Sequence, residues 1–226
     1  ELEEIMDLLT TNETYFFREE FQLKAFIEEI VPEICAARAR KPGLNNHRLR
    51  IWSAGCSTGE EPYTIAMLLL EMACMDGWTI EVIGTDISQR VLQQARRGIY
   101  GASAFRATSD YFRTKYFEPQ ADGNFRISDH VRKLVSISHL NLLDSDRMRM
   151  LGSFDIIFCR NVIIYFDTMA KRKVVESFYR VLRESGFLLL GHSESLMNIT
   201  TLFSLRHFKN DMVYQKPAVS SSVGIA

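Results

Sequence analysis

One strand–loop–helix pattern constrains the fold of this chain more than any other feature. Residues 49–67 read "LRIWSAGCSTGEEPYTIAM": an apolar run, a loop bounded by Gly55 and Gly59, and then an apolar helical pattern. A glycine loop between a strand and a helix is typical of nucleotide-binding α/β sheets. The third glycine of the dinucleotide fingerprint is absent, however, and Glu60 and Glu61 stand where a phosphate would meet the helix N-terminus. We therefore expect a ligand without a pyrophosphate.

The rest of the chain continues the alternation of strands and helices. Hydrophobic periodicity predicts strands at 49–55, 79–87, 133–143, 154–161 and 187–193, and helices at 18–40, 62–77, 88–100 and 167–186. Such alternation predicts a parallel sheet with helices on both faces. The stretches "LFSLRHF" and "MVYQKP" predict a closing antiparallel hairpin. This ending is the pattern of class I S-adenosylmethionine-dependent methyltransferases, so the predicted fold class is α/β with that Rossmann-like sheet.

The predicted domain organisation has three parts. Residues 1–46 form an N-terminal helical segment, 47–216 the methyltransferase-type domain, and 217–226 a disordered tail. Within the domain, about 99–133 is an aromatic, basic stretch that predicts a small antiparallel β insertion, with "ADGN" at 121–124 as its turn. The chain does not begin with methionine, so we expect that an upstream segment has been removed.

Composition excludes several classes of protein. The 226 residues carry a formal net charge of −1, which gives no general attraction to nucleic acid. The apolar runs are too short to span a bilayer, and the acidic N-terminus is no signal peptide. The four cysteines lack C-x-x-C or metal-ligand spacing, which indicates reduced thiols, a cytoplasmic protein and no metal site.

Polar residues follow the predicted strands at the edge where such sheets bind ligands. Asp86 ends the second strand, where its two oxygens suit the ribose hydroxyls of an adenosine. Asn141 follows the third strand and can donate to and accept from an adenine edge, and Asn161 follows the fourth. The simpler explanation of Asp86 is that it is a helix N-cap, and the simpler explanation of Asn141 is that it is a turn residue.

Glu60 favours one particular cofactor. S-adenosylmethionine carries a sulfonium and an ammonium group and no phosphate, so a carboxylate in the glycine loop attracts it. Gly55 and Gly59 would let the backbone approach that ligand. Alternatively, both glutamates only complement the helix dipole, an effect worth about 0.3–1 kcal/mol. We expect Glu60 to contact the cofactor, and the sequence leaves open whether Glu61 does more than match the dipole.

Six stretches in a fixed order resemble one known family. These are "NETYFFRE" (12–19), "IWSAGCSTGEEPYTIAM" (51–67), "GTDIS" (84–88), "NLL" (141–143), "FDIIFCRNVIIYFD" (154–167) and "GHSES" (191–195). Together they resemble the chemotaxis receptor methyltransferases, the CheR family, over about residues 10–216. The resemblance implies methyl transfer from S-adenosylmethionine to glutamate side chains on the cytoplasmic helices of chemoreceptors. It implies that the cofactor is bound by Asn12, Thr14, Arg18, Gly55, Glu60, Asp86, Asn141, Leu142, Asn161 and Val162.

The resemblance also carries expectations about partners. Members usually have an N-terminal helical domain, of which "ELEEIMDLL" would be the last remnant. In the family the β insertion can bind a C-terminal receptor peptide by strand addition. We expect a monomer that contacts receptor helices, with neither nucleic acid nor membrane insertion. A solvated basic face is the simpler explanation of the positive charges in 99–133.

The expected reaction assigns roles to two side chains. A glutamate acceptor is already ionised at neutral pH, because its reference pKa is about 4.3, so no general base is needed. We expect Tyr165 to donate to the unreactive oxygen of the acceptor and Arg18 to hold its charge. An aromatic residue at the start of a packed helix is the simpler explanation of Tyr165.

Two other functions remain open from the sequence. One is an S-adenosylmethionine-dependent methyltransferase that acts on RNA or a small molecule. The stretch "NVIIY" at 161–165 lacks the prolines of the Asn/Asp-Pro-Pro-Tyr motif in amino-methylating nucleic-acid enzymes. The other is a non-catalytic, cofactor-binding signalling module.

Overall fold

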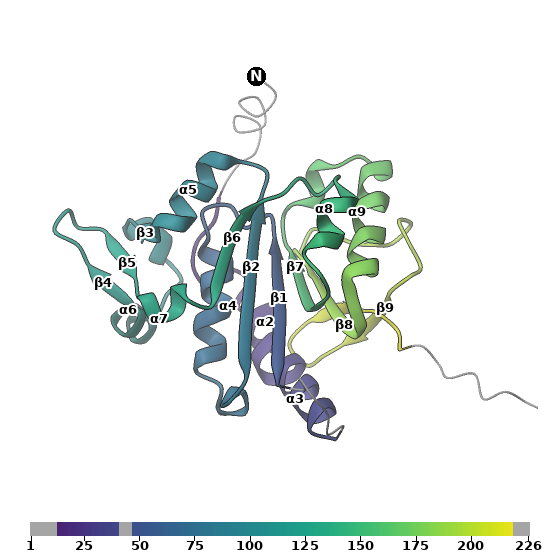
Figure 1. Cartoon of the computed structure of the whole chain (residues 1–226), viewed down its shortest axis with the longest axis horizontal. Coiled ribbons are helices and arrows are strands. Elements are labelled where there is room, and N and C mark those ends of the chain that lie inside the picture. The colour runs from purple at the N-terminus through teal and green to yellow at the C-terminus, as the bar shows by residue number, and fades with distance from the viewer. Residues whose placement is uncertain (1–12, 41–46, 219–226) are drawn as a thin grey trace, which may run out of the picture.

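The computed structural model describes residues 13–40 and 47–218, and its centre is a seven-stranded sheet (Figure 1). The strand order is β6-β2-β1-β7-β8-β10-β9. The strands are β1 Arg48–Ala54, β2 Thr79–Asp86, β6 Val135–His139, β7 Phe154–Cys159, β8 Leu182–Leu190, β9 Ser204–His207 and β10 Met212–Gln215. The first five in this order are parallel, whereas β10 runs antiparallel to both β8 and β9. The parallel sheet with a closing hairpin confirms the predicted fold class.

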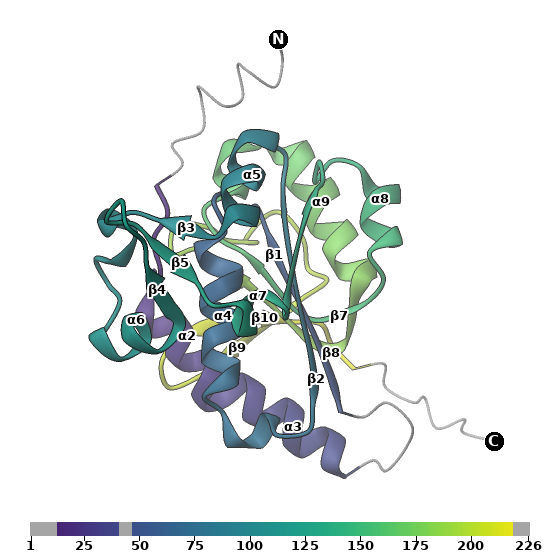
Figure 2. The same ribbon diagram turned by 60° about the vertical axis from the view of Figure 1, so that its left-hand side comes forward.

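Helices cover both faces of the sheet (Figure 2). They are α2 Glu20–Ala25, a π-helical turn η1 Phe26–Ile30, α3 Val31–Ala39, α4 Glu60–Leu70, α5 Gln89–Arg97, α8 Ser145–Met150 and α9 Thr168–Val181, with 3₁₀ turns η2 Ala73–Met75 and η4 Ile163–Tyr165. The helices α2, α3 and α4 lie on one face, and α8 and α9 on the other. None of the helices in the described part of the chain is long and apolar enough to cross a membrane.

Strand alternation divides the hydrophobic core into two layers. In β1, Leu49 and Ile51 join the layer under α2–α4, whereas Trp52 and Ala54 join the layer under α8 and α9. All four side chains are fully buried. The period of two along a strand thus supplies apolar side chains to both faces, as a parallel sheet requires.

The predicted β insertion forms a separate three-stranded antiparallel sheet of order β3-β5-β4. Its elements are β3 Ile99–Tyr100, η3 Ala102–Phe105, α6 Asp110–Tyr116, β4 Phe117–Pro119, β5 Phe125–Ile127 and α7 Asp129–Arg132. This small sheet lies to one side of the main sheet (Figure 1). The predicted turn at 121–124 connects β4 and β5, and its Gly123 has φ 82°. Lys115 and Tyr116, directly before β4, end α6.

The predicted helices differ from the structure in their bounds. Those expected at 62–77 and 88–100 end early, at Leu70 and Arg97, and residues 99–100 form β3 instead. The helix expected at 18–40 begins only at Glu20, and a π turn interrupts its α-helical hydrogen bonding just before Pro32, whose ring and missing N–H disfavour a regular α-helix at this point. Phe21, an apolar residue in the first turn of α2, is 63% exposed. The helix expected at 167–186 ends at Val181 because β8 begins at Leu182, and Gly186 lies inside that strand.

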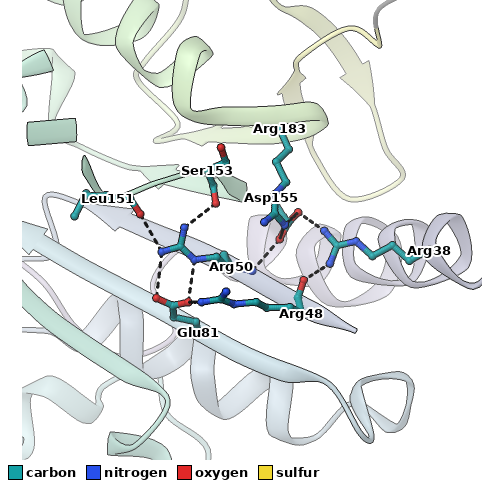
Figure 3. Close-up of polar contacts among 8 residues, drawn as sticks. All are labelled: Arg38, Arg48, Arg50, Glu81, Leu151, Ser153, Asp155 and Arg183. Atoms are coloured by element: carbon teal, nitrogen blue, oxygen red, sulfur yellow. Dashed lines mark hydrogen bonds and ion pairs between the residues drawn. The ribbon is translucent and has the colours of Figure 1, made fainter. Parts of the chain in front are cut away.

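A buried carboxylate fixes the edge of the sheet opposite to the carboxyl ends of the strands (Figure 3). Asp155 in β7 is 4% exposed and accepts from the backbone N–H of Arg50 in β1 at 2.8 Å. Its carboxylate also binds the guanidinium groups of Arg38 from α3 and Arg183 from β8, the latter at 2.8 Å. One side chain therefore connects two strands and a helix to β7.

We expect Asp155→Asn to destabilise the fold strongly. The amide keeps the shape but leaves Arg38 and Arg183, whose side chains are 18% and 39% exposed, without their counter-charge. Breaking a fully buried pair typically costs about 3–5 kcal/mol, and the partial exposure of the two arginines lowers the expected loss to about 2–3 kcal/mol. Urea unfolding measures this loss. The matched control is Asp146→Asn, whose carboxylate is 78% exposed and pairs with Arg149 on the surface. Equal stability of the two variants would contradict the role of Asp155.

Candidate active site

A cavity of about 340 Å³ lies where β1, β2, β6 and β7 end. Its lining comes from the loops that follow these strands and from residues 13–18. Eight residues predicted to bind cofactor line it: Thr14, Arg18, Gly55, Asp86, Asn141, Leu142, Asn161 and Val162. Tyr165 lines it as well. Asn12 lies outside the described residues, and Glu60 is not part of the lining.

The glycine loop and the loop after β7 approach each other closely. Gly55 has φ 83°, and a Cβ atom at this position would lie 2.4 Å from Cγ2 of Val162. A side chain at position 55 would therefore be strained by its backbone and would force these loops apart. Glycine at position 55 allows both loops to line one cavity.

The Asp86 carboxylate is held in a fixed orientation at the cavity. Its Oδ2 accepts from the backbone N–H of Ser57 at 2.9 Å, and its Oδ1 from that of Ser88 at 3.0 Å. The helix cap of α5 is Ser88, whose Oγ accepts from the N–H of Val91 at 3.4 Å. The N-cap explanation of Asp86 is therefore wrong, because Ser88 caps this helix.

The Asn141 side chain stabilises a local turn, as the simpler explanation of this residue predicts. Its Oδ1 accepts from the backbone N–H of Leu143 at 2.9 Å. This bond orients the side chain at the cavity edge, between the apolar residues Leu140 and Leu142. The turn geometry and the predicted ligand contact are compatible.

The segment 13–18 reaches the cavity from outside the main sheet because Phe16 anchors it. Phe16 is fully buried, and its ring centroid lies 4.8 Å from Tyr100, 5.3 Å from Phe105 and 5.0 Å from Phe117. Its backbone N–H donates to the carbonyl of Ala104 at 3.0 Å. The neighbours of this anchor, among them Thr14 and Arg18, are thereby placed over the cavity.

The two adjacent glutamates lie differently from the prediction. Glu61 lines the cavity, whereas Glu60 is 3% exposed and accepts from the Thr58 hydroxyl at 2.7 Å. Burial raises the pKa of the Glu60 carboxyl, and hydrogen bonds from Thr58 and Thr14 partly oppose that shift. This geometry argues against a direct cofactor contact for Glu60. It indicates that Glu60 holds Thr14, which does line the cavity.

Glu61 forms a buried ion pair with Arg160, which also lines the cavity. The Nε of Arg160 lies 2.7 Å from Oε2 of Glu61, and the Ser53 hydroxyl donates to Oε1 at 2.7 Å. The Nη2 of Arg160 donates to the carbonyl of Arg18 at 3.0 Å. Arg160 therefore connects the end of β7 with α4 and with the N-terminal segment. The sequence places Arg160 at a strand end but does not indicate these partners.

The two predicted catalytic side chains lie at the rim of the cavity. Tyr165 ends η4 and is 51% exposed. The guanidinium of Arg18 donates to the carbonyl of Glu13 and lies 5.9 Å from the ring centroid of Tyr15. Both are accessible from solvent, as an acceptor on another protein would require.

The surroundings of Cys56 keep its thiol from ionising. Cys56 lines the cavity but is 2% exposed. Burial raises the pKa of its thiol, and the nearby carboxylates of Asp86, Glu61 and Glu60 raise it further. The thiol stays protonated and is a poor nucleophile.

The lining fits S-adenosylmethionine better than a dinucleotide. Three carboxylates line the cavity, from Glu13, Glu61 and Asp86, against two guanidinium groups, from Arg18 and Arg160. A pyrophosphate would meet an excess of negative charge, whereas a sulfonium and an ammonium are attracted. Apolar side chains at the ends of β2, β6 and β7 offer surfaces for an adenine ring.

Comparison with known proteins identifies the family. The family described as "CheR methyltransferase, SAM binding domain" matches residues 12–212. "Chemotaxis protein methyltransferase 2" of Vibrio cholerae is 41% identical over 218 residues, which cover 96% of this chain and 74% of that protein. "Chemotaxis protein methyltransferase" of Borreliella burgdorferi is 38% identical over 198 residues, 87% of this chain and 69% of that protein. "Chemotaxis protein methyltransferase Cher2" of Pseudomonas putida is 33% identical over 218 residues, which cover 94% of this chain and 76% of that protein.

The fold and the cavity define a class I methyltransferase that uses S-adenosylmethionine. With these matches, the chain belongs to the CheR methyltransferases, the enzymes of methylation in chemotaxis. The family, the enzyme class and the cofactor predicted from the sequence are thereby confirmed.

We expect Asp86→Ala to weaken cofactor binding about 10- to 100-fold. The substitution removes a charged acceptor, and hydrogen bonds to charged groups are worth about 1.5–3 kcal/mol. Titration calorimetry with S-adenosylhomocysteine measures the dissociation constant. Asp146→Ala, on the exposed surface of α8, is the control and should bind as the wild type does. An Asp86→Ala affinity within twofold of wild type would contradict the assignment.

Glu60→Gln should raise the melting temperature at pH 7–8. Because burial raises the pKa of Glu60, the folded state binds the proton more tightly than the unfolded chain, and stability falls as pH rises above the usual carboxyl range. Glutamine stays uncharged, so its advantage should shrink towards pH 4. Thermal unfolding from pH 4 to 8 measures this, with Glu20→Gln at an exposed ion pair as the control. A destabilisation that is the same at every pH would contradict the expectation.

Proposed function

We propose that this enzyme transfers the methyl group of S-adenosylmethionine to glutamate side chains of chemoreceptor cytoplasmic domains and forms methyl esters. The observation that carries this proposal is the cavity at the carboxyl ends of the strands, with Tyr165 and Arg18 at its rim. Its relatives named as chemotaxis protein methyltransferases support it. When bound, S-adenosylmethionine supplies an electrophilic methyl group.

The cofactor site of this proposal combines the ends of four strands, the N-terminal segment and the start of α4. Asp86 accepts from the ribose, Asn141 and Leu142 contact the adenine, and Gly55 lets the backbone approach. Asn161 and Val162 complete the wall on the β7 side, and Thr14 the wall on the N-terminal side. Glu61 and Arg160 supply the charges near the amino-acid end, and Glu60 acts through Thr14.

The chain's main tasks in catalysis are positioning and the exclusion of water. A glutamate acceptor is ionised at neutral pH, so no residue has to remove a proton. We assign to Tyr165 a hydrogen bond to the unreactive oxygen of the acceptor, and to Arg18 an attraction for its negative charge. Together they would align the reacting oxygen with the methyl group.

The partners follow from the same proposal. The acceptor is a receptor helix that presents a glutamate to the rim, and the enzyme acts as a monomer in the cytoplasm. A receptor peptide that adds a strand to the insertion has two candidate edges, β3 and β4, because β5 is the central strand of the small sheet.

Incubation with methyl-labelled S-adenosylmethionine and purified receptor cytoplasmic fragments tests the proposal. We expect base-labile label on the fragments, since methyl esters hydrolyse in alkali. Asp86→Ala provides the matched control, with little label at low cofactor concentration. Label that enters added total RNA instead, or label that resists alkali, would contradict the proposed substrate.

Tyr165→Phe should lower kcat by about 10-fold or more and leave the affinity for S-adenosylhomocysteine within twofold. The phenol would bind the acceptor and not the cofactor, and a hydrogen bond to a charged group is worth about 1.5–3 kcal/mol. Steady-state kinetics and calorimetry measure the two quantities. Tyr111→Phe, in the exposed part of α6, is the control. Equal losses of turnover and cofactor affinity would contradict this role.

A further inference from the structure

We infer that Glu194 is a positioning residue of the methyl-transfer reaction: its carboxylate holds the loop that carries Tyr165. Glu194 lies beyond the end of β8, within "GHSES", and does not line the cavity. It acts on the reaction through backbone amides only. The activity part of this inference rests on the proposed function, whereas the structural part does not.

The Glu194 carboxylate accepts hydrogen bonds from four backbone N–H groups. Its Oε2 accepts from Gly191 at 2.7 Å and from Asn161 at 2.8 Å. Its Oε1 accepts from Val162 at 2.8 Å and from Ile164 at 3.2 Å. A single side chain thereby joins the loop after β8 to the loop after β7.

The loop after β7 needs such an acceptor because of its own geometry. Asn161 has φ 59°, in the left-handed region that costs energy for a residue with a side chain. The following turn η4 has three residues, so its first N–H groups have no acceptor within the helix. Charged acceptors form stronger hydrogen bonds with backbone N–H groups than neutral ones do. The carboxylate stabilises a backbone that local sequence does not favour.

Gly191 makes room for this arrangement. A Cβ atom at this position would lie 2.9 Å from Oε2 of Glu194 and 2.8 Å from the backbone nitrogen of Asn161. Any side chain here would push the carboxylate away from the amides. The glycine and the glutamate of "GHSES" therefore serve one structural purpose.

The held loop forms the side of the cavity that we assign to the acceptor. It carries Ile164 and Tyr165, which are 41% and 51% exposed at the rim. The same loop carries Asn161 and Val162 of the proposed cofactor wall, so loss of the carboxylate should displace Tyr165 and loosen that wall, while Asp86 and Gly55, which follow other strands, keep their places. A displacement of about 1 Å in an active site can lower the rate about 100-fold.

Glu194→Gln tests the inference with two independent readouts. The glutamine side chain has an NH2 group in place of one carboxylate oxygen. This NH2 group is a donor, so it cannot accept from the backbone N–H groups that it would face. We expect amide hydrogen exchange over 161–164 to become at least 10-fold faster. We also expect kcat to fall about 100-fold, whereas KM for S-adenosylmethionine should rise by less than about 10-fold, because only the β7 side of the cofactor wall is disturbed. Glu194→Asp keeps the charge, is one methylene shorter, and should show smaller changes in the same direction.

Controls separate this inference from the proposed function. Glu176→Gln, at an exposed ion pair on α9, should leave both readouts unchanged. Unchanged exchange over 161–164 in both Glu194 variants would overturn the inference, as would faster exchange with an unchanged kcat. A rise in KM as large as the fall in kcat would also overturn it, because the residue would then act through the cofactor site rather than through Tyr165. The proposed function has its own failure, which is that the wild type does not label receptor fragments. The hydrogen-exchange result does not depend on the labelling result.

Discussion

The parallel register of β2, β1 and β7 is the constraint on which the rest of the structure depends. Ala54 pairs with Thr85, and Ser53 with Phe158, so the three strands end at one edge of the sheet. The residues that follow these strands then meet in one cavity. At the opposite edge, Asp155 joins β7 to β1 and to α3 through the amide of Arg50 and the guanidinium of Arg38. Asp155 thus helps to fix the strand register at the edge of the sheet that lies away from the cavity.

Features with a local cause could be predicted from the sequence. Ser88 caps α5 and Asp167 caps α9 because a hydroxyl or carboxylate before a helix accepts from its first turn. The strands were predictable from runs of apolar residues, and parallel strands bring their following residues together. These two rules were sufficient to place Asp86, Asn141 and Asn161 at one cavity before the structure was known.

Features with a tertiary cause could not be predicted from the sequence. Glu60 and Glu61 differ by one position on a helix, or about 100° of rotation, and only packing decides which faces the cavity. Likewise, Phe21 is as apolar as Phe26, but Phe21 is exposed whereas Phe26 is fully buried. The partners of Arg160 and Glu194 come from distant parts of the chain, so no local pattern indicates them.

The anchoring of Phe16 links the stability of two parts of the chain. Its ring packs among Tyr100, Phe105 and Phe117, so the N-terminal segment and the small sheet share one hydrophobic cluster. Arg106 reinforces the link through an ion pair with Glu13 at 2.6 Å. Segments that share a core open together as one cooperative unit in native-state fluctuations. A ligand that touches Thr14 should therefore also suppress the opening of strands that it does not touch, so occupancy of the cavity should appear as slower hydrogen exchange in the small sheet.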